Sequence, residues 1–198
     1  HDDRVCAYAE LEALFSLDMP EKTAVCILAD KEEIGSVGIS GMQSHYFEHF
    51  MEGLCDAQGV KLSDCFANSF CLSADVSNAF DPNWPETCDK RNNSQLNYGV
   101  AICKYTGSRG KGGASDASAE AMGHVRSTLD KAGVIWQIAT LGKVDQGGGG
   151  TVAAYMANRN IVTVDAGVPV LSMHAPLELV SKLDCYETML ACKAIYLA

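Results

Sequence analysis

Short apolar runs and longer amphipathic stretches alternate along the chain. The apolar runs are continuous, as is typical of strands buried on both faces of a sheet. They cover residues 23–30, 68–75, 99–106, 134–140, 161–167 and 168–174. Between them, helical spacing of apolar positions and helix-start signals predict helices over about 3–15, 42–54, 116–132, 151–156 and 178–197.

This alternation predicts the fold class. Strands that alternate with helices imply an α/β domain, here a three-layer α/β/α sandwich with a mostly parallel, mixed central sheet. Residues 78–97 are expected to form a long loop, and a glycine-rich loop over 107–115 is expected to lead into a helix capped by Asp116. The length suits a single domain over residues 1–198.

Side chains with metal-binding or acid–base chemistry gather at the predicted strand ends. Asp30 to Glu33 end the first strand, Asp75 ends the second, and His174 follows the last. Ligands of open α/β sheets bind at the carboxyl ends of the strands. Carboxylate oxygen and imidazole nitrogen suit zinc, manganese or cobalt. The sequence therefore indicates a divalent metal site at this edge, with Asp2 as a further candidate ligand.

Each of these candidate ligands also has a simpler interpretation. Asp2 or Asp3 can cap the first helix, because aspartate is a favoured N-cap residue. Asp75 can cap a turn, and His174 can be a hydrogen-bonded core histidine. These alternatives stay open, since no spacing here is as specific as that of a zinc finger.

The adjacent pair Glu32 and Glu33 can serve two different roles. In two-metal hydrolysis, one carboxylate holds a metal and another, outside the coordination sphere, takes a proton from water. Neighbouring glutamates on one turn can supply both groups. The alternative is an exposed acidic turn.

Two glycine-rich segments, 107–113 and 147–150, match no phosphate-binding fingerprint. Lys111 is followed by glycine rather than serine or threonine, and no G-x-G-x-x-G follows the first strand. Flexible loops at a sheet edge are the more typical interpretation. The peptide N–H groups of Gly148 and Gly149 can still hold a substrate carboxylate or carbonyl, and Lys104 and Arg109 can bind anionic groups.

His45 and His49 lie one helical turn apart, as two zinc ligands would. They lack the H-E-x-x-H order, because Glu48 directly precedes the second histidine. A partly buried helix face is therefore the favoured interpretation.

Composition and charge limit the binding partners and the cellular compartment that we expect. The net charge of −10 and the pI near 4.8 argue against nucleic acid and against an anionic membrane surface. The nine cysteines are odd in number and contain no C-x-x-C, which favours a reducing compartment and hence the cytoplasm. No apolar run is long enough to span a membrane, so no membrane partner is expected.

Four segments together resemble one family. They are Asp2–Asp3–Arg4, DKEEIGSVG at 30–38, SADVSNAFDPN at 73–83 and SMHAPLE at 172–178. In this order they resemble the motifs of the M18 (aspartyl aminopeptidase-like) metallopeptidases, and the resemblance runs from the first residue to the last predicted helix. The M42 and M28 peptidases share the fold and the paired glutamates and remain alternatives, as aminopeptidases or deacylases.

The resemblance implies a role for each matching position. Asp2 corresponds to a metal-bridging aspartate, Glu32 to the general base, and Glu33, Asp75 and His174 to metal ligands. It implies a zinc-exopeptidase-like fold and two divalent ions, with zinc expected and cobalt or manganese as alternatives. It also implies removal of N-terminal residues from peptide substrates, and homo-oligomers that are dodecamers in the family.

The resemblance also implies elements that this sequence does not contain. The family has a further histidine ligand upstream, followed by an inserted lid and dimerisation domain. Residues 1–198 therefore look like the second half of the subunit, with four of five ligands. Asn78 and Leu177 replace a histidine and an arginine that many members carry, which weakens the expected preference for acidic residues. Lys104 is the candidate for binding an acidic side chain of the substrate.

Three functional hypotheses follow from the sequence. The first is a dinuclear metal-dependent aminopeptidase. The second is a non-catalytic fragment or assembly piece that lacks a complete metal site. The third is a nucleotide-binding module that uses the glycine-rich segments.

Overall fold

The computed structural model describes all residues 1–198. Its helices are α1 Arg4–Phe15, α2 Tyr46–Gln58, α3 Leu62–Ala67, α4 Ala119–Ala132, α5 Ala153–Ala157 and α6 Lys182–Tyr196, with 3-10 turns η1 Glu32–Ile34 and η2 Pro85–Thr87. Its strands are β1 Phe70–Ala74, β2 Ser77–Asn78, β3 Val100–Cys103, β4 Tyr105–Ser108, β5 Gly112–Asp116, β6 Trp136–Ile138, β7 Val162–Gly167, β8 Pro169–Leu171 and β9 Leu179–Val180. None of the helices is both long and apolar enough to cross a membrane.

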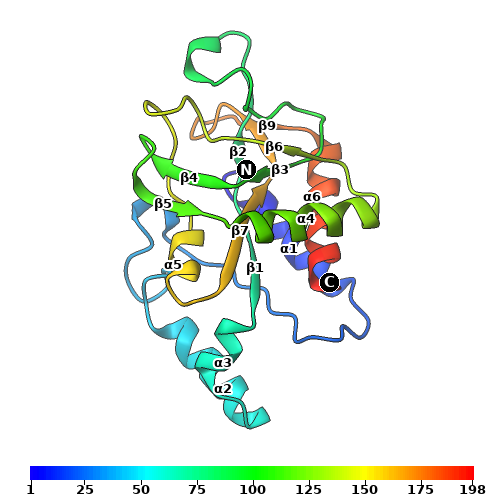
Figure 1. Ribbon diagram of the computed structural model, residues 1–198. Helices are drawn as coiled ribbons and strands as arrows, with labels where there is room; N and C mark the ends of the chain where they lie inside the picture. Colours follow the sequence, from blue (N-terminus) through cyan, green and yellow to red (C-terminus); the bar gives the residue numbers. More distant parts are fainter.

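The central sheet is mixed, which confirms the predicted α/β class. Its strand order is β1-β7-β3-β6, with β1 parallel to β7, β3 parallel to β6, and β3 antiparallel to β7. A small sheet, β2-β8-β9, and a hairpin, β4-β5, complete the strands. Figure 1 shows α4 and α6 beside the sheet, and α2 and α3 beyond the start of β1.

The two faces of the central sheet are covered by different helices. Side chains alternate between faces along a strand. Val100 and Ile102 of β3 join Val164 of β7 in one core cluster with Val125 and Leu129 of α4. That cluster also includes α6, against which α1 packs. A second cluster joins α2, α3 and α5 with the residue that precedes β7. Helices therefore lie on both sides, as the alternation predicts.

The prediction of a sheet strand over residues 23–30 is wrong. The segment is not assigned to any strand and forms no ladder within residues 1–198. Val25, Ile27 and Ala29 pack against the cluster of α2, α3 and α5, whereas Leu28 between them is 55% exposed. An apolar run indicates that a segment is buried, and it does not indicate whether the segment is hydrogen-bonded to a neighbouring strand. The sequence pattern alone therefore cannot distinguish this segment from a strand.

The glycine-rich loop predicted over 107–115 is instead a hairpin. Tyr105 pairs with Asp116 and Thr106 with Ser115. The following helix begins at Ala119, and its cap is Ser118, whose side chain accepts a hydrogen bond from the Ala121 N–H at 3.1 Å. Asp116, the predicted cap, ends β5 instead and forms an ion pair with Lys104. Glycine obscured the strand because it is rare in strand interiors.

Gly167 of β7 lies very close to the backbone of Asp75, the residue after β1. A Cβ on Gly167 would lie 1.7 Å from the backbone oxygen of Asp75 and 2.5 Å from its carbonyl carbon. Only glycine fits this contact without moving the backbone that carries Asp75. The close approach therefore sets where a predicted metal ligand leaves the sheet.

We expect Gly167→Ala to lower the free energy of unfolding by about 3 kcal/mol, the upper end of the usual cost of overpacking, because backbone must move to admit the Cβ. Gly123→Ala is the matched control, since Gly123 lies within α4 and its Cβ would meet nothing within 4 Å. That change should raise stability by about 1 kcal/mol. Urea unfolding of both variants measures the difference, and equal midpoints would contradict the expectation.

Candidate metal centre

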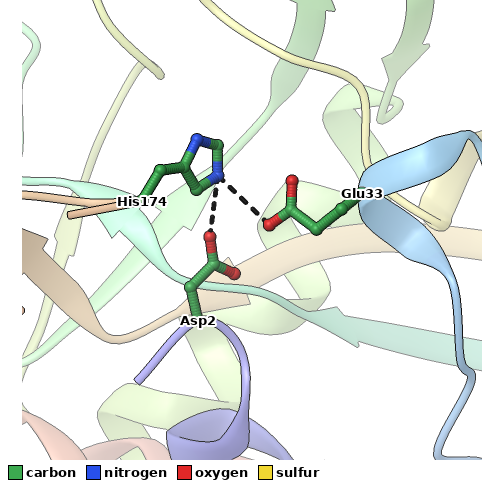
Figure 2. A group of neighbouring side chains, drawn as sticks. All are labelled: Asp2, Glu33 and His174. Carbon is green, nitrogen blue, oxygen red and sulfur yellow. Dashed lines mark ion pairs between the residues drawn. The ribbon is translucent and has the colours of Figure 1, made fainter. Parts of the chain in front are cut away.

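Three predicted ligands converge from three distant parts of the chain. Asp2 lies just before α1, Glu33 lies in η1, and His174 lies in the turn after β8 (Figure 2). The Nε2 atom of His174 is 3.0 Å from Asp2 Oδ2 and 3.1 Å from Glu33 Oε1. One donor atom from each residue lies within 4.8 Å of the other two. The chain therefore closes on itself around one cluster of metal-binding atoms.

The donor set fits a divalent cation. An imidazole nitrogen and two carboxylate oxygens are ligands that zinc accepts. Glu33 and His174 are exposed, whereas Asp2 is partly buried, so the cluster is open to solvent on one side. Burial, followed by the charge of Glu33, raises the pKa of Asp2. A cation among these carboxylates would offset both effects.

Asp75 lies close to the cluster but outside the three-residue group. Burial is the main cause that raises the pKa of Asp75 to about 9, and the charges of Asp3, Glu32 and Asp2 add to it. The residue immediately follows β1, in register with the Gly167 end of β7. The metal role predicted for Asp75 stays a prediction.

Glu32 occupies a different environment from its neighbour Glu33. Glu32 is half-buried and Glu33 is exposed, although both lie on the turn η1. Burial, then the charges of Glu33 and Asp2, raises the pKa of Glu32. A carboxylate with a raised pKa beside a metal-binding cluster is suited to accept and return a proton. The two glutamates can therefore do different chemistry.

The turn that carries these glutamates is held by its own backbone and by two side chains. Lys31 precedes it in the left-handed region at φ 63°, and Gly35 ends it at φ 91°. The Gly35 carbonyl accepts hydrogen bonds from Gln43 Nε2 at 2.6 Å and from the Tyr155 hydroxyl at 3.3 Å. Tyr155 belongs to α5, so the turn is tied to a helix that packs on β7.

The adjacent aspartates at the start of the chain have separate roles. The Asp3 side chain accepts a hydrogen bond from the Cys6 N–H at 3.3 Å and caps α1. Burial raises the pKa of Asp3 to about 7. Asp2 faces His174 and Glu33 instead. The capping interpretation therefore applies to Asp3 and leaves Asp2 free to bind a cation.

Glu178 is a component of the site to which the sequence assigned no role. Its Oε2 accepts a hydrogen bond from the Asp2 N–H at 2.8 Å, and its Oε1 accepts one from the His174 N–H at 2.8 Å. The amino group of His1 also lies 2.6 Å from Oε2. The only sequence signal was an acid shortly after His174.

The predicted substrate-binding residues do not join the three-residue group. Lys104 pairs with Asp116 across the base of the hairpin. Gly148, at φ 89°, packs so closely on the hairpin that a Cβ would lie 2.5 Å from the Gly107 oxygen, and Gly149 follows it in the same loop. Their roles toward a substrate stay predictions.

The histidine pair on α2 is exposed rather than partly buried. His45 Nδ1 lies 2.7 Å from Glu48 Oε2, and the rings of His45 and His49 stack with centroids 6.5 Å apart. Neither histidine belongs to the metal-binding cluster. The preference for a helix-surface role over a zinc role agrees with this arrangement, whereas the expected partial burial is wrong.

Asp165 holds the end of the second glycine-rich loop through a hydrogen bond. It lies in β7, is 6% exposed, and accepts a hydrogen bond from Thr151 Oγ1 at 2.7 Å, directly after the loop 147–150. Sequence reasoning overlooked this residue, although an acid inside the apolar run IVTVDAG was a visible signal. The glycine loop is thus fastened to the central sheet.

A mixed sheet with carboxylates and a histidine gathered at one edge is the arrangement expected of a metal-binding α/β domain. The family model described as "Aminopeptidase I zinc metalloprotease (M18)" matches residues 1–196. The chain therefore belongs to the M18 family of zinc metalloproteases, which confirms the resemblance.

Individual relatives agree with this assignment. A probable M18 family aminopeptidase 1 of Clostridium acetobutylicum is 50% identical over 191 residues, which cover 94% of this chain and 41% of that protein. The crystal structure of an M18 aminopeptidase from Thermotoga maritima superposes with a TM-score of 0.94 at 44% identity, over 98% of this chain and 44% of that one. A dodecameric S. cerevisiae mApe1 structure has a TM-score of 0.77 at 24% identity, over 98% of this chain and 45% of that one, and shares the fold. The chain spans less than half the length of these relatives.

The buried Asp165 predicts a specific pH dependence of stability. Burial raises its pKa to about 6, while the hydrogen bond from Thr151 lowers it. An unfolded aspartate titrates near pH 4, so between about pH 4 and 6 the folded chain holds a proton that the unfolded chain has lost. The contribution of Asp165 to stability is therefore largest at low pH and falls as the pH rises through this window.

We expect Asp165→Asn to lack this fall, because asparagine does not titrate. Its free energy of unfolding relative to wild type should become more favourable from pH 4 to about 6 and then level off. Thr151→Val should extend the fall to higher pH, because it removes the donor that lowers the pKa. Urea unfolding at several pH values measures both effects, and a difference between Asp165→Asn and wild type that does not vary with pH would contradict the assignment.

Proposed function

We propose that this chain forms part of the catalytic domain of a dinuclear metal-dependent aminopeptidase that removes N-terminal residues from peptides. The observation that carries the proposal is the convergence of Asp2, Glu33 and His174, with the half-buried Glu32 on the same turn as Glu33. Membership of the M18 family and the names of its relatives support the reaction class.

Two divalent ions, zinc by the description of the family, would be held by Asp2, Glu33, Asp75 and His174. Asp2 is assigned the position between the ions. When bound, such ions polarise the scissile carbonyl and make water a better nucleophile. The family description supports zinc, whereas the number of ions is part of the proposal.

Glu32 is assigned the acid–base role. Its carboxylate takes the proton from the attacking water and returns it to the nitrogen of the leaving amine. Burial, then the charges of Glu33 and Asp2, raises its pKa, which makes this carboxylate a stronger proton acceptor than an ordinary glutamate. Glu33, on the same turn, keeps its oxygen directed at His174 and Asp2.

Substrate contacts are assigned to the hairpin and to the glycine loop. The peptide N–H groups of Gly148 and Gly149 would hold the substrate backbone, and Lys104 would read an acidic side chain. Asp116 already pairs with Lys104, so an acidic substrate must compete with that carboxylate. This competition supports a weaker preference for acidic residues than the resemblance to aspartyl aminopeptidase-like enzymes implies.

The remaining assignments concern the intact protein. The dodecameric mApe1 structure supports a homo-oligomer, and the free cysteines support the cytoplasm. The net charge of −10 supports a protein without nucleic-acid or membrane partners. The placement of residues 1–198 as one catalytic domain rests on the match over residues 1–196.

We expect Glu32→Gln to lower aminopeptidase turnover by about 100-fold or more, because general acid–base catalysis contributes about 10²–10⁴-fold. Its zinc content should equal that of wild type. Glu33→Gln is the matched variant on the same turn and should lose zinc as well as turnover. Hydrolysis of aminoacyl nitroanilides and elemental analysis of dialysed protein make the two measurements. Substantial activity in Glu32→Gln would show that the base is another group.

The zinc content of the unmutated chain tests the proposal against its rival. Two zinc ions per chain are expected for a dinuclear enzyme. Fewer than one per chain would favour a non-catalytic assembly piece. A chain that holds two ions but hydrolyses no aminoacyl nitroanilide would contradict the catalytic part of the proposal alone.

A further inference from the structure

One carboxylate joins the two ends of the metal-binding cluster. Glu178 accepts a hydrogen bond from the peptide N–H of Asp2 and another from that of His174, each at 2.8 Å. Each bond uses a different carboxylate oxygen. The side chain of Glu178 is 8% exposed, so water competes little for these bonds. It is not one of the three cluster residues, and it contacts the backbone N–H groups of two of them and the amino group of His1.

The position of Glu178 follows from the pairing of two short strands. β8 and β9 are antiparallel, with Leu171 opposite Leu179 and Val170 opposite Val180. The chain between them, residues 172–178, turns out from the sheet and returns, and Glu178 stands where it returns. Asp2 belongs to the other end of the chain and meets this loop through Glu178 and His174.

The backbone at His174 needs an external restraint. His174 has φ 66° and Ser172 has φ 60°, both in the left-handed region that residues other than glycine seldom adopt. Such conformations persist where surrounding contacts hold them. Within the loop, the Ala175 N–H bonds to the Ser172 carbonyl at 2.9 Å. The bond from the His174 N–H to Glu178 is the second restraint, and it acts directly on the residue that carries the imidazole.

We propose that Glu178 is a positioning residue that holds Asp2 and His174 at the separation at which both can bind one cation. The inference rests on the proposed metal site, and it assigns the geometry of that site to a carboxylate that touches no metal. Hydrogen bonds to an ionised carboxylate are stronger than neutral ones and well directed. Two of them from one side chain couple the start of the chain to the β8–β9 loop.

Three substitutions separate positioning from charge. Glu178→Ala removes both acceptors and the charge. Glu178→Gln keeps the length but offers one oxygen and one amide group, so one of the two N–H groups loses its acceptor. Glu178→Asp keeps the charge and both oxygens but is one methylene shorter, so it cannot span the two donors. Glu52→Gln, on the exposed face of α2, is the control for loss of one negative charge.

The test is the binding of Co²⁺ to each metal-free variant, followed by its visible absorption, with thermal unfolding of the metal-free proteins measured alongside. We expect the Kd of Glu178→Ala to rise about 10–100-fold, as for other residues that orient metal ligands, together with a changed absorption band. Glu178→Gln should fall between Ala and wild type, and Glu52→Gln should match wild type. Glu178→Asp should also bind more weakly than wild type.

The outcomes distinguish this inference from the proposed function. Wild-type affinity and spectrum in Glu178→Ala, or in the other two variants where Ala fails to fold, would overturn the positioning role and leave the metal site standing. Wild-type binding by Glu178→Asp alone would show that charge rather than position matters, and would overturn it too. A lower melting temperature with unchanged Kd would show a purely structural role. If the wild-type chain binds no Co²⁺, the proposed function fails, and the inference fails with it.

Discussion

Repulsion between carboxylates crowded at one edge of the central sheet is the constraint around which the site is built. In addition to the larger effect of burial, the charges of Glu33 and Asp2 raise the pKa of Glu32, and those of Glu32 and Asp2 raise that of Asp75. His174 is the one basic side chain in the metal-binding cluster. Holding these groups together costs free energy that the packed core must offset, and a bound cation would turn the repulsion into attraction.

The scaffold meets this constraint with rigid attachments on each side of the cluster. Asp75 leaves the sheet where Gly167 lets β7 and β1 approach, and His174 is carried by the loop between β8 and β9. The glutamate turn is bound through Gly35 to Gln43 and to Tyr155 of α5. Functional side chains need such support, because a site that is loose by about 1 Å loses most of its activity.

Much of the fold follows from local pattern. The apolar runs at 68–75, 134–140 and 161–167 contain β1, β6 and β7, and the amphipathic stretches contain α1, α4 and α6. The errors fall where the pattern of apolar residues reflects a property other than pairing in a sheet. Residues 23–30 pack on a cluster and form no ladder with another strand of residues 1–198. The hairpin β4-β5 was hidden by its glycines, which tolerate a bulged and twisted ladder that side-chain preference does not reveal.

For the site, the sequence by itself determined the chemistry: carboxylates and a histidine at strand ends, and two adjacent glutamates available for different work. Residue type and strand period are local properties, so they can be read without coordinates. The M18-like motifs assigned Asp2 and Glu33 to the metal and Glu32 to acid–base chemistry. Only the tertiary structure showed that Asp2 and Glu33 face His174, that Asp3 caps α1, and that Glu178 joins Asp2 to His174. Those contacts depend on how segments far apart in the sequence pack together, and residue spacing along the chain does not reveal that packing.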